Sequence, residues 1–141
     1  MLARDLRGVA RPNSIDGAMS PKHVLVVDDD PMVLEIVERA LSAAHFRVSK
    51  ARRVSIAKDV LIRQTIDLII SDARIPGETG LHLAATAQQL GIAFILMSGD
   101  PEWAAEHGIA SDQYLAKPFE LRHLVKLVHT SLNGGLPLNQ A

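Results

Sequence analysis

Short apolar runs alternate along this chain with stretches in which apolar residues recur every three or four positions. Such runs, rich in branched side chains, are typical of strands buried on both faces of a parallel sheet, whereas the longer spacing is typical of helices with one apolar face. The runs predict strands at 24–27, 46–48, 67–71, 92–97 and 112–116. The amphipathic stretches predict helices at 31–45, 54–64, 81 to near 91, 101–108 and 119–132.

Proline and glycine mark the boundaries of several of these elements. Pro31 and Pro101 stand where a helix is expected to begin, a position that suits the fixed backbone of proline. Asp30 precedes Pro31 and has the side chain expected of an N-cap. After the strand 67–71, Pro76 and Gly77 predict a loop.

Five strands that alternate with five helices predict an α/β domain with a parallel sheet, helices on both faces and right-handed crossovers. We expect this domain to span residues 22–133. Residues 1–21 lack the apolar core of a signal peptide and are predicted to be a poorly ordered extension. Residues 134–141 are predicted to be a loose tail.

Composition narrows the class of protein. The 141 residues include 15 basic and 16 acidic side chains, which is not the basic footprint of a nucleic-acid binder. No cysteine is present, which excludes disulfides and thiolate chemistry and is compatible with a reducing cytoplasm, where we expect the protein to act. No apolar run approaches the roughly 20 residues that span a bilayer. The six histidines are scattered, and we expect surface or packing roles for them.

Polar side chains follow the predicted strands at their carboxyl ends. Asp28 and Asp29 follow the first strand, Asp72 the third, Ser98 the fourth and Lys117 the fifth. In a parallel sheet these ends lie at one edge, where ligands of open α/β sheets bind. Three clustered carboxylates repel one another, so the pattern predicts a cation, and an all-oxygen site with few protein ligands suits Mg²⁺.

The remaining two side chains suit an anion. Lys117 and Ser98 would meet a phosphoryl group carried on Asp72, an aspartyl phosphate being a known form of covalent carboxylate chemistry. The metal would neutralise charge during the transfer.

Four motifs, in order and at these spacings, resemble the receiver domain of bacterial two-component response regulators. They are VVDDDP at 26–31, SDARIPG at 71–77, MSG at 97–99 and YLAKPF at 114–119. The resemblance runs from about residue 23 to residue 132. It implies a flavodoxin-like (βα)5 fold, doubly wound, with a five-stranded parallel sheet in the order 2-1-3-4-5, the order found in the chemotaxis regulator of this family.

The resemblance also implies roles at the metal site. Asp72 is expected to be the phosphoacceptor. Asp28 and Asp29 are expected to hold Mg²⁺ together with Asp72, Asp29 being the direct ligand. The backbone carbonyl of Arg74 is expected to supply another oxygen.

Further roles concern the response to phosphorylation. Lys117 is expected to contact the phosphoryl group, and its peptide bond to Pro118 to be cis. The Ser98 hydroxyl is expected to turn toward the phosphate, and Tyr114 to move inward with it. The face formed by residues 100–132 would then be the output surface, biased between two states.

Some positions depart from the usual family pattern. Thr79 stands where an Asp is frequent, a change that we expect to be harmless. Arg74 and Asp100 occupy positions that tune hydrolysis of the phosphoryl group, which leaves its lifetime open. Arg52 and Arg53 stand where many members have a small turn, and the sequence gives no functional account of them.

The resemblance favours a phosphoacceptor that assists its own phosphorylation and dephosphorylation over an enzyme with turnover. The expected partners are a sensor histidine kinase or histidine phosphotransfer protein and an unknown downstream protein, without nucleic acid or membrane. Too little chain follows Phe119 for a DNA-binding module, so we expect a stand-alone receiver or one separated from a larger protein.

Two other functions stay open. A phosphohydrolase of the haloacid-dehalogenase type also uses a strand-end Asp, Mg²⁺, a Ser or Thr and a Lys, but its first-strand motif ends in Thr or Val where this chain has Met32, and no lid insertion is present. The other alternative is an interaction module that works without phosphorylation. The presence of all three acidic residues, Asp28, Asp29 and Asp72, argues against it.

Overall fold

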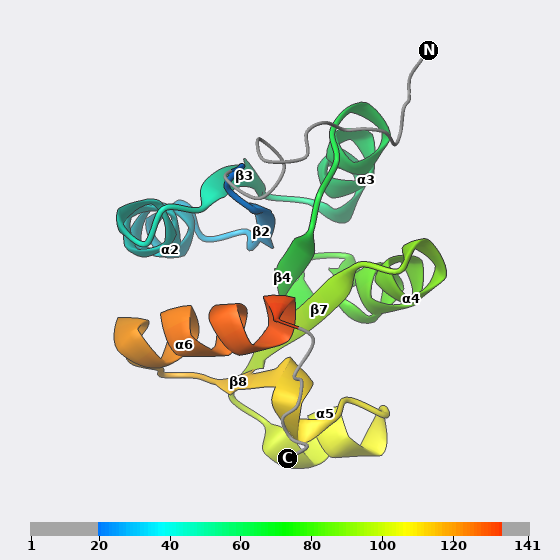
Figure 1. The fold of residues 1–141 in the computed structure, drawn as a ribbon. Coiled ribbons are helices and arrows are strands. Elements are labelled where there is room, and N and C mark those ends of the chain that lie inside the picture. Colours follow the sequence, from blue (N-terminus) through cyan, green and yellow to red (C-terminus); the bar gives the residue numbers. More distant parts are fainter. Residues whose placement is uncertain (1–19, 134–141) are drawn as a thin grey trace.

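A five-stranded parallel sheet forms the centre of the domain (Figure 1). The computed structural model describes residues 20–133, so that the predicted tail and all but the last two residues of the predicted N-terminal extension lie outside the described residues. In spatial order the strands are β3 (Arg47–Ala51), β2 (His23–Val27), β4 (Leu68–Asp72), β7 (Ala93–Ser98) and β8 (Tyr114–Ala116). This is the order 2-1-3-4-5 along the chain, so the predicted flavodoxin-like topology is confirmed.

Helices cover both faces of the sheet (Figure 1). On one face lie α2 (Pro31–Ala43) and α6 (Leu121–Leu132). On the other lie α3 (Val54–Arg63), α4 (Leu81–Leu90) and the short α5 (Pro101–Glu106). No helix within residues 20–133 combines the length and the apolar character needed to cross a membrane.

The alternation of side chains along each strand divides the core into two layers. Val24 and Val26 point to the layer under α2 and α6, while Leu25 and Val27 point to the layer under α3 and α4. All four side chains are fully buried. A strand covered on both faces needs apolar residues at every position, which explains the continuous apolar runs in the sequence.

Local signals set several helix boundaries as the sequence predicts. The Asp30 carboxylate accepts a hydrogen bond from the Met32 backbone N–H at 2.9 Å and caps α2. Asp100 caps α5 in the same way through the Trp103 N–H. Gly91 ends α4 in the left-handed conformation, at φ +70°.

The segment after β4 differs from the prediction. On either side of the loop predicted at Pro76 and Gly77, β5 (Arg74–Ile75) and β6 (Glu78–Thr79) form a small antiparallel hairpin. Pro76 and Gly77 make its turn, with Gly77 at φ +74°, where glycine is unstrained. The predicted strand 112–116 is also shorter, because residues Ser111–Gln113 form the 3₁₀ turn η1 before β8.

The inner face of α4 is formed by Leu83 and Ala87, which are fully buried, whereas Ala85 and Gln88 are exposed. The helix itself is confirmed, but an Ala-rich segment carries too little hydrophobic contrast to reveal its inner face.

Gly80, at the N-cap of α4, lies against the end of β4. A β-carbon at this position would overlap the Asp72 carbonyl oxygen and crowd the Ser71 hydroxyl. The absence of a side chain at Gly80 therefore allows α4 to begin directly beside the residue that ends the strand.

We expect Gly80→Ala to lower the free energy of unfolding by roughly 1–3 kcal/mol, because the backbone at Asp72 must shift. Urea denaturation measures the change. Gly99→Ala is the matched control, since a β-carbon there meets the Lys117 carbonyl oxygen at an ordinary 3.7 Å. Equal effects of the two substitutions would contradict the proposed overlap.

His23 is a buried side chain at the amino end of β2. Its Nε2 is hydrogen-bonded to the Ser49 hydroxyl at 2.8 Å, and its backbone N–H donates to the Asp67 carboxylate at 2.8 Å. Burial lowers the pKa of His23 below its ordinary value, and the charge of Arg47 lowers it further, while Asp67 opposes the shift. The folded state therefore favours the neutral imidazole.

A lowered pKa in the folded state makes stability depend on pH in one direction. The contribution of His23 is full above about pH 6.5 and is lost as the pH falls toward the lowered pKa, because the unfolded chain then binds the proton more readily. We expect His23→Gln to flatten the fall in unfolding free energy below about pH 6.5. His82→Gln, on the exposed surface of α4, should leave the pH profile unchanged; parallel wild-type and His23→Gln profiles would count against this account.

Candidate functional site

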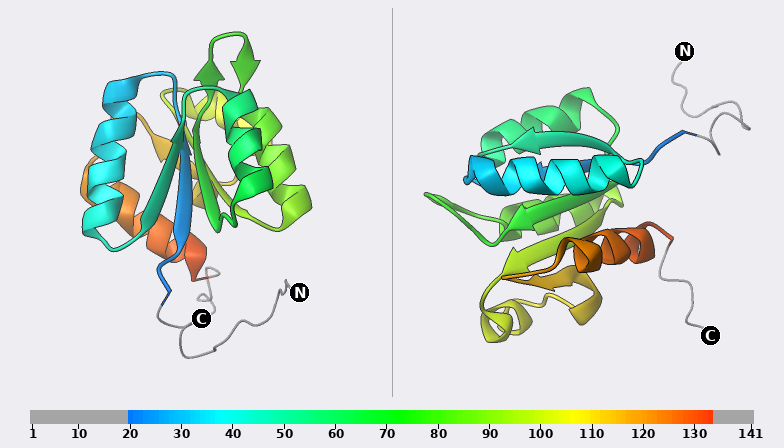
Figure 2. Two further views of the ribbon diagram at one scale, coloured as in Figure 1. Left: turned by 90° about the horizontal axis from the view of Figure 1, so that it is seen from above. Right: turned by 90° about the vertical axis from the view of Figure 1, so that its left-hand side faces the viewer.

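The five strand-end residues selected from the sequence meet at one edge of the sheet, which is uppermost in the left view of Figure 2. Asp72 and Ser98 are the last residues of β4 and β7. Asp28 and Asp29 follow β2 directly, and Lys117 follows β8. The prediction that they lie together is confirmed, because parallel strands in register end side by side.

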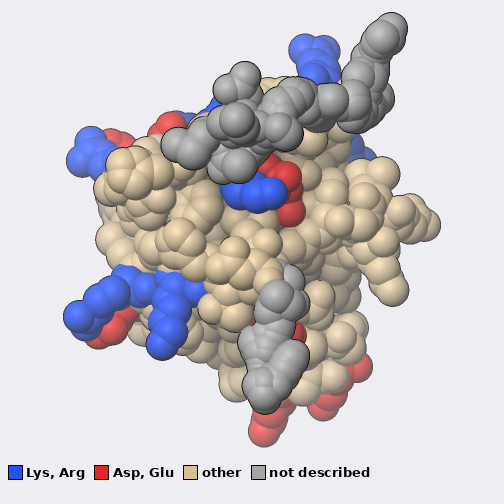
Figure 3. Space-filling view, viewed as in Figure 1, with Lys and Arg blue, Asp and Glu red and all other residues tan. Residues whose placement is uncertain are grey.

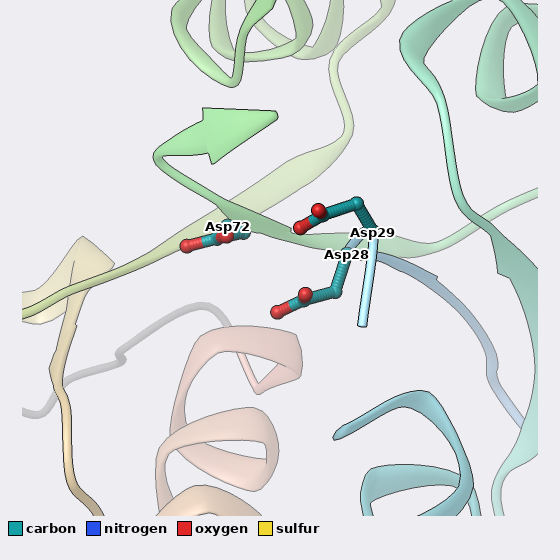
Figure 4. A group of neighbouring side chains, drawn as sticks. All are labelled: Asp28, Asp29 and Asp72. Carbon is teal, nitrogen blue, oxygen red and sulfur yellow. The ribbon is translucent and has the colours of Figure 1, made fainter. Parts of the chain in front are cut away.

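Three carboxylates form the centre of this site. Oxygen atoms of Asp28, Asp29 and Asp72 lie within 4.8 Å of one another. Figure 4 shows Asp28 and Asp29 reaching toward Asp72 from the segment after β2. The Asp28 side chain is 1% exposed, and burial raises its pKa, although the Asp30 N–H at 2.9 Å and the charge of Lys117 partly offset this effect.

Lys117 is the cation that faces this cluster. Its Nζ lies 3.1 Å from Oδ1 of Asp72 and 3.3 Å from Oδ2 of Asp28. Burial alone would lower the pKa of Lys117, but the hydrogen bond to Asp72 and the charges of both carboxylates raise it above its ordinary value. The ammonium group is therefore charged at neutral pH and neutralises one of the three carboxylates.

The donor set fits a divalent cation. Three ionised carboxylates and one ammonium group carry a formal charge of −2 within a few ångströms. The ligating atoms are all hard oxygens, the type that Mg²⁺ prefers. Asp28, Asp29 and Asp72 are the residues that would hold it. Arg74 lies two residues after Asp72, the last residue of β4. That its backbone carbonyl binds the metal stays a prediction.

A hollow of about 490 Å³ opens beside Asp72. Its other walls come from the start of the hairpin and from the segment after β7, namely Ala73, Arg74, Ser98, Gly99 and Asp100. The Asp72 side chain is 14% exposed, so that it is the carboxylate through which a ligand in this hollow reaches the cluster.

Ser98 and Tyr114 are linked to each other and not to Asp72. The Ser98 hydroxyl accepts a hydrogen bond from the Asp100 N–H at 3.0 Å. The Tyr114 hydroxyl donates to the Ser98 carbonyl at 2.7 Å, so the ring already rests against the end of β7. Their predicted movement on phosphorylation stays a prediction.

The backbone around Lys117 holds its side chain at the site. The Lys117 N–H donates to the Ser98 carbonyl at 2.9 Å and continues the β7–β8 pairing. The peptide bond between Lys117 and Pro118 is cis, as the resemblance implies.

Two contacts at this edge were missed by the sequence reasoning. The Arg52 guanidinium donates from Nε and Nη2 to the Asp29 carbonyl, at 3.3 and 3.2 Å. The Glu78 carboxylate accepts from the Val54 N–H at 3.0 Å and takes the place of a side-chain cap at the start of α3. The partners are more than 20 residues apart, and no local pattern reveals such pairs.

Charged side chains on the opposite edge are dispersed. In Figure 3, which looks onto the amino ends of the strands, Lys and Arg side chains form small separate groups, several of them beside Asp or Glu. The part of this face that belongs to described residues therefore presents no continuous basic stripe for a nucleic acid backbone.

We expect Lys117→Met to lower the free energy of unfolding by roughly 1–3 kcal/mol, because it leaves buried Asp28 without a counter-charge; the value is reduced for the 30% exposure of Lys117. Saturating MgCl₂ should then stabilise Lys117→Met more than the wild type, since the ammonium no longer competes for the same oxygens. Thermal unfolding with and without the salt measures both effects, with Lys126→Met on α6 as the control. If MgCl₂ raised the unfolding temperature equally in the wild type and both variants, Lys117 would not compete with Mg²⁺ for the carboxylate oxygens.

A doubly wound sheet in this order, with its polar residues at the carboxyl edge, defines the flavodoxin-like class of α/β domains. Within this class, the chain belongs to the response regulator receiver domain family, whose model matches residues 24–129. It is therefore a receiver domain of two-component response regulators.

Individual relatives agree with this family. The response regulator protein PilR of Pseudomonas aeruginosa is 34% identical over 119 residues, covering 81% of this chain and 27% of PilR. The TorCAD operon transcriptional regulatory protein TorR of Escherichia coli K12 is 30% identical over 118 residues, covering 79% and 50%. The signal receiver domain of an HD domain-containing protein from Pseudomonas fluorescens superimposes with a TM-score of 0.72 at 27% identity, covering 82% and 89%.

The chain thus spans half or less of the length of these two curated relatives. The likeness concerns the receiver portion, and a stand-alone role stays a prediction.

Proposed function

We propose that Asp72 accepts a phosphoryl group from a phosphohistidine on a sensor histidine kinase or histidine phosphotransfer protein. The observation that carries this proposal is the position of Asp72, a partly exposed member of the acidic cluster that is hydrogen-bonded to Lys117 and open to the hollow beside Ser98. The family supports it, since receiver domains take part in two-component signalling.

The transfer forms a bond between phosphorus and a carboxylate oxygen of Asp72 and breaks the phosphorus–nitrogen bond of the donor. The imidazole leaves with the electron pair and takes up a proton. Bound Mg²⁺ would supply positive charge for the phosphoryl oxygens. Lys117, now hydrogen-bonded to Asp72, is placed to exchange that carboxylate for a phosphoryl oxygen.

The response begins at Ser98 in this proposal. Its hydroxyl, which now accepts a hydrogen bond from the Asp100 N–H, turns away and donates one to a phosphoryl oxygen, and the strand end to which Tyr114 is bonded moves with it. The face formed by residues 100–132 then presents a changed surface to a downstream protein.

Burial argues against the haloacid-dehalogenase alternative. In that class the nucleophile comes from the first strand, here Asp28, but the Asp28 side chain is 1% exposed and already accepts hydrogen bonds from Lys117 and the Asp30 N–H. A substrate phosphate reaches Asp72 far more easily. We therefore favour a carrier of the phosphoryl group over a hydrolase with turnover.

Incubation with acetyl phosphate and MgCl₂ tests the proposal. We expect intact-protein mass spectrometry at neutral pH to show an added phosphoryl group that is labile in base and absent from Asp72→Asn. Asp59→Asn, an exposed carboxylate on α3, is the control and should label like the wild type.

Two results would decide against the proposal. If the wild type gained no phosphoryl group on Asp72, this result would favour the interaction module that needs no phosphorylation. Steady hydrolysis of a phosphomonoester that is lost in Asp28→Asn and kept in Asp72→Asn would favour the hydrolase.

A further inference from the structure

A second hollow, of about 450 Å³, opens at the same edge, and Asp29 belongs both to it and to the acidic cluster. We call it the arginine groove. Its walls come from the segment after β2, the loop between β3 and α3, the first turn of α3 and the hairpin: Asp29, Arg52, Arg53, Ile56, Ile75 and Pro76. None of the roles assigned above uses its arginines.

Two hydrogen-bonded contacts fix the walls of the arginine groove. Arg52 ties the β3–α3 loop to the Asp29 carbonyl, through both Nε and Nη2. Glu78 ties the start of α3 to the hairpin through the Val54 N–H. The groove is therefore formed before any partner arrives, which lowers the entropic cost of binding.

The groove offers unpaired positive charge next to apolar surface. Among residues 20–133, neither Arg52 nor Arg53 forms an ion pair with a carboxylate, and both are exposed. Ile56 is 45% exposed beside them, and Pro76 is exposed on the hairpin turn. Arginine beside apolar side chains is the composition of protein–protein interfaces.

Building on the proposed function, we propose that the arginine groove receives an acidic segment, carrying an apolar side chain, of the phosphohistidine protein that serves Asp72. A protein that brings its histidine to Asp72 must cover neighbouring surface, and the groove shares Asp29 with that site. The acidic cluster repels an acidic partner, and Arg53 supplies the attraction that orients it.

A protein segment fits this groove better than a free small anion. Small-molecule sites enclose their ligand and place polar groups inside a cavity, whereas both guanidinium groups here lie exposed at an open surface. Exposed charges of this kind act chiefly on the rate and specificity of protein association.

The test compares two phosphodonors with the full chain. The protein donor is a purified, autophosphorylated histidine kinase that labels the wild type, selected from the kinases of the source organism; the small donor is acetyl phosphate. We expect Arg53→Glu to slow transfer from the kinase by about tenfold or more, and less so at high salt, while labelling by acetyl phosphate is unchanged. Arg63→Glu, the same charge reversal at the far end of α3, should behave like the wild type.

A second variant separates recognition from folding. Arg53 occupies the N-cap position of α3, so Arg53→Ser removes the charge while placing a favourable cap residue there. This variant should also slow phosphoryl transfer from the kinase, while its unfolding midpoint is at or above that of the wild type. Arg52 is left intact because it holds the Asp29 carbonyl.

Several outcomes would overturn the proposal. Transfer from the kinase at the wild-type rate in both Arg53 variants would show that the groove does not contact the donor protein. A selective loss of labelling by acetyl phosphate would point to a small-anion site, and a change in sedimentation to a second copy of this chain. If acetyl phosphate labelled the wild type but no kinase did, the proposal of a phosphohistidine protein as the partner of the groove would be wrong. If neither donor labelled it, the proposed function of Asp72 would be wrong as well.

Discussion

The repulsion among three carboxylates at one edge of the sheet is the constraint on which the site depends. Asp28 is buried and Asp72 nearly so, and a single ammonium group, that of Lys117, faces both of them. Removing these charges from water costs free energy that their mutual geometry must offset. Such a cluster costs stability and favours a bound cation, which is how functional sites commonly depart from the most stable arrangement.

The strands convert this local constraint into a connection across the domain. Asp72 ends β4, Ser98 ends the adjacent β7, and Tyr114 begins the next strand and is bonded to the Ser98 carbonyl. The backbone pairing of β4 with β7, and of β7 with β8, therefore connects the strand end at Asp72 to the edge strand β8. On the other side of the cluster, Asp29 leads through its own carbonyl to Arg52 and the β3–α3 loop. The site thus has one connection toward the proposed output face and a separate one toward the arginine groove.

The sequence predicts most of the sheet and its site because both depend on local patterns. Fully apolar runs such as 68–70 allow only a strand covered on both faces, and parallel strands necessarily bring Asp28, Asp72 and Lys117 to one edge. The β5–β6 hairpin escapes prediction because two-residue strands have no periodicity. The contacts of Arg52 and Glu78 escape it because they join distant segments, and the need for glycine at position 80 appears only when α4 is placed against β4.

The bond between Glu78 and the Val54 N–H has a consequence for protein engineering. Hairpins at the edge of a domain are attractive modules to exchange between relatives, because they are short and lie outside the sheet. Arg53, at the N-cap of α3, makes no capping hydrogen bond with its side chain, and within residues 20–133 it is Glu78 of the hairpin that accepts from the Val54 N–H. A chimera that imports residues 74–79 without an acceptor at position 78 would leave that N–H unpaired and loosen a helix that the exchange never touched. The hairpin and the start of α3 should therefore be transplanted as one unit.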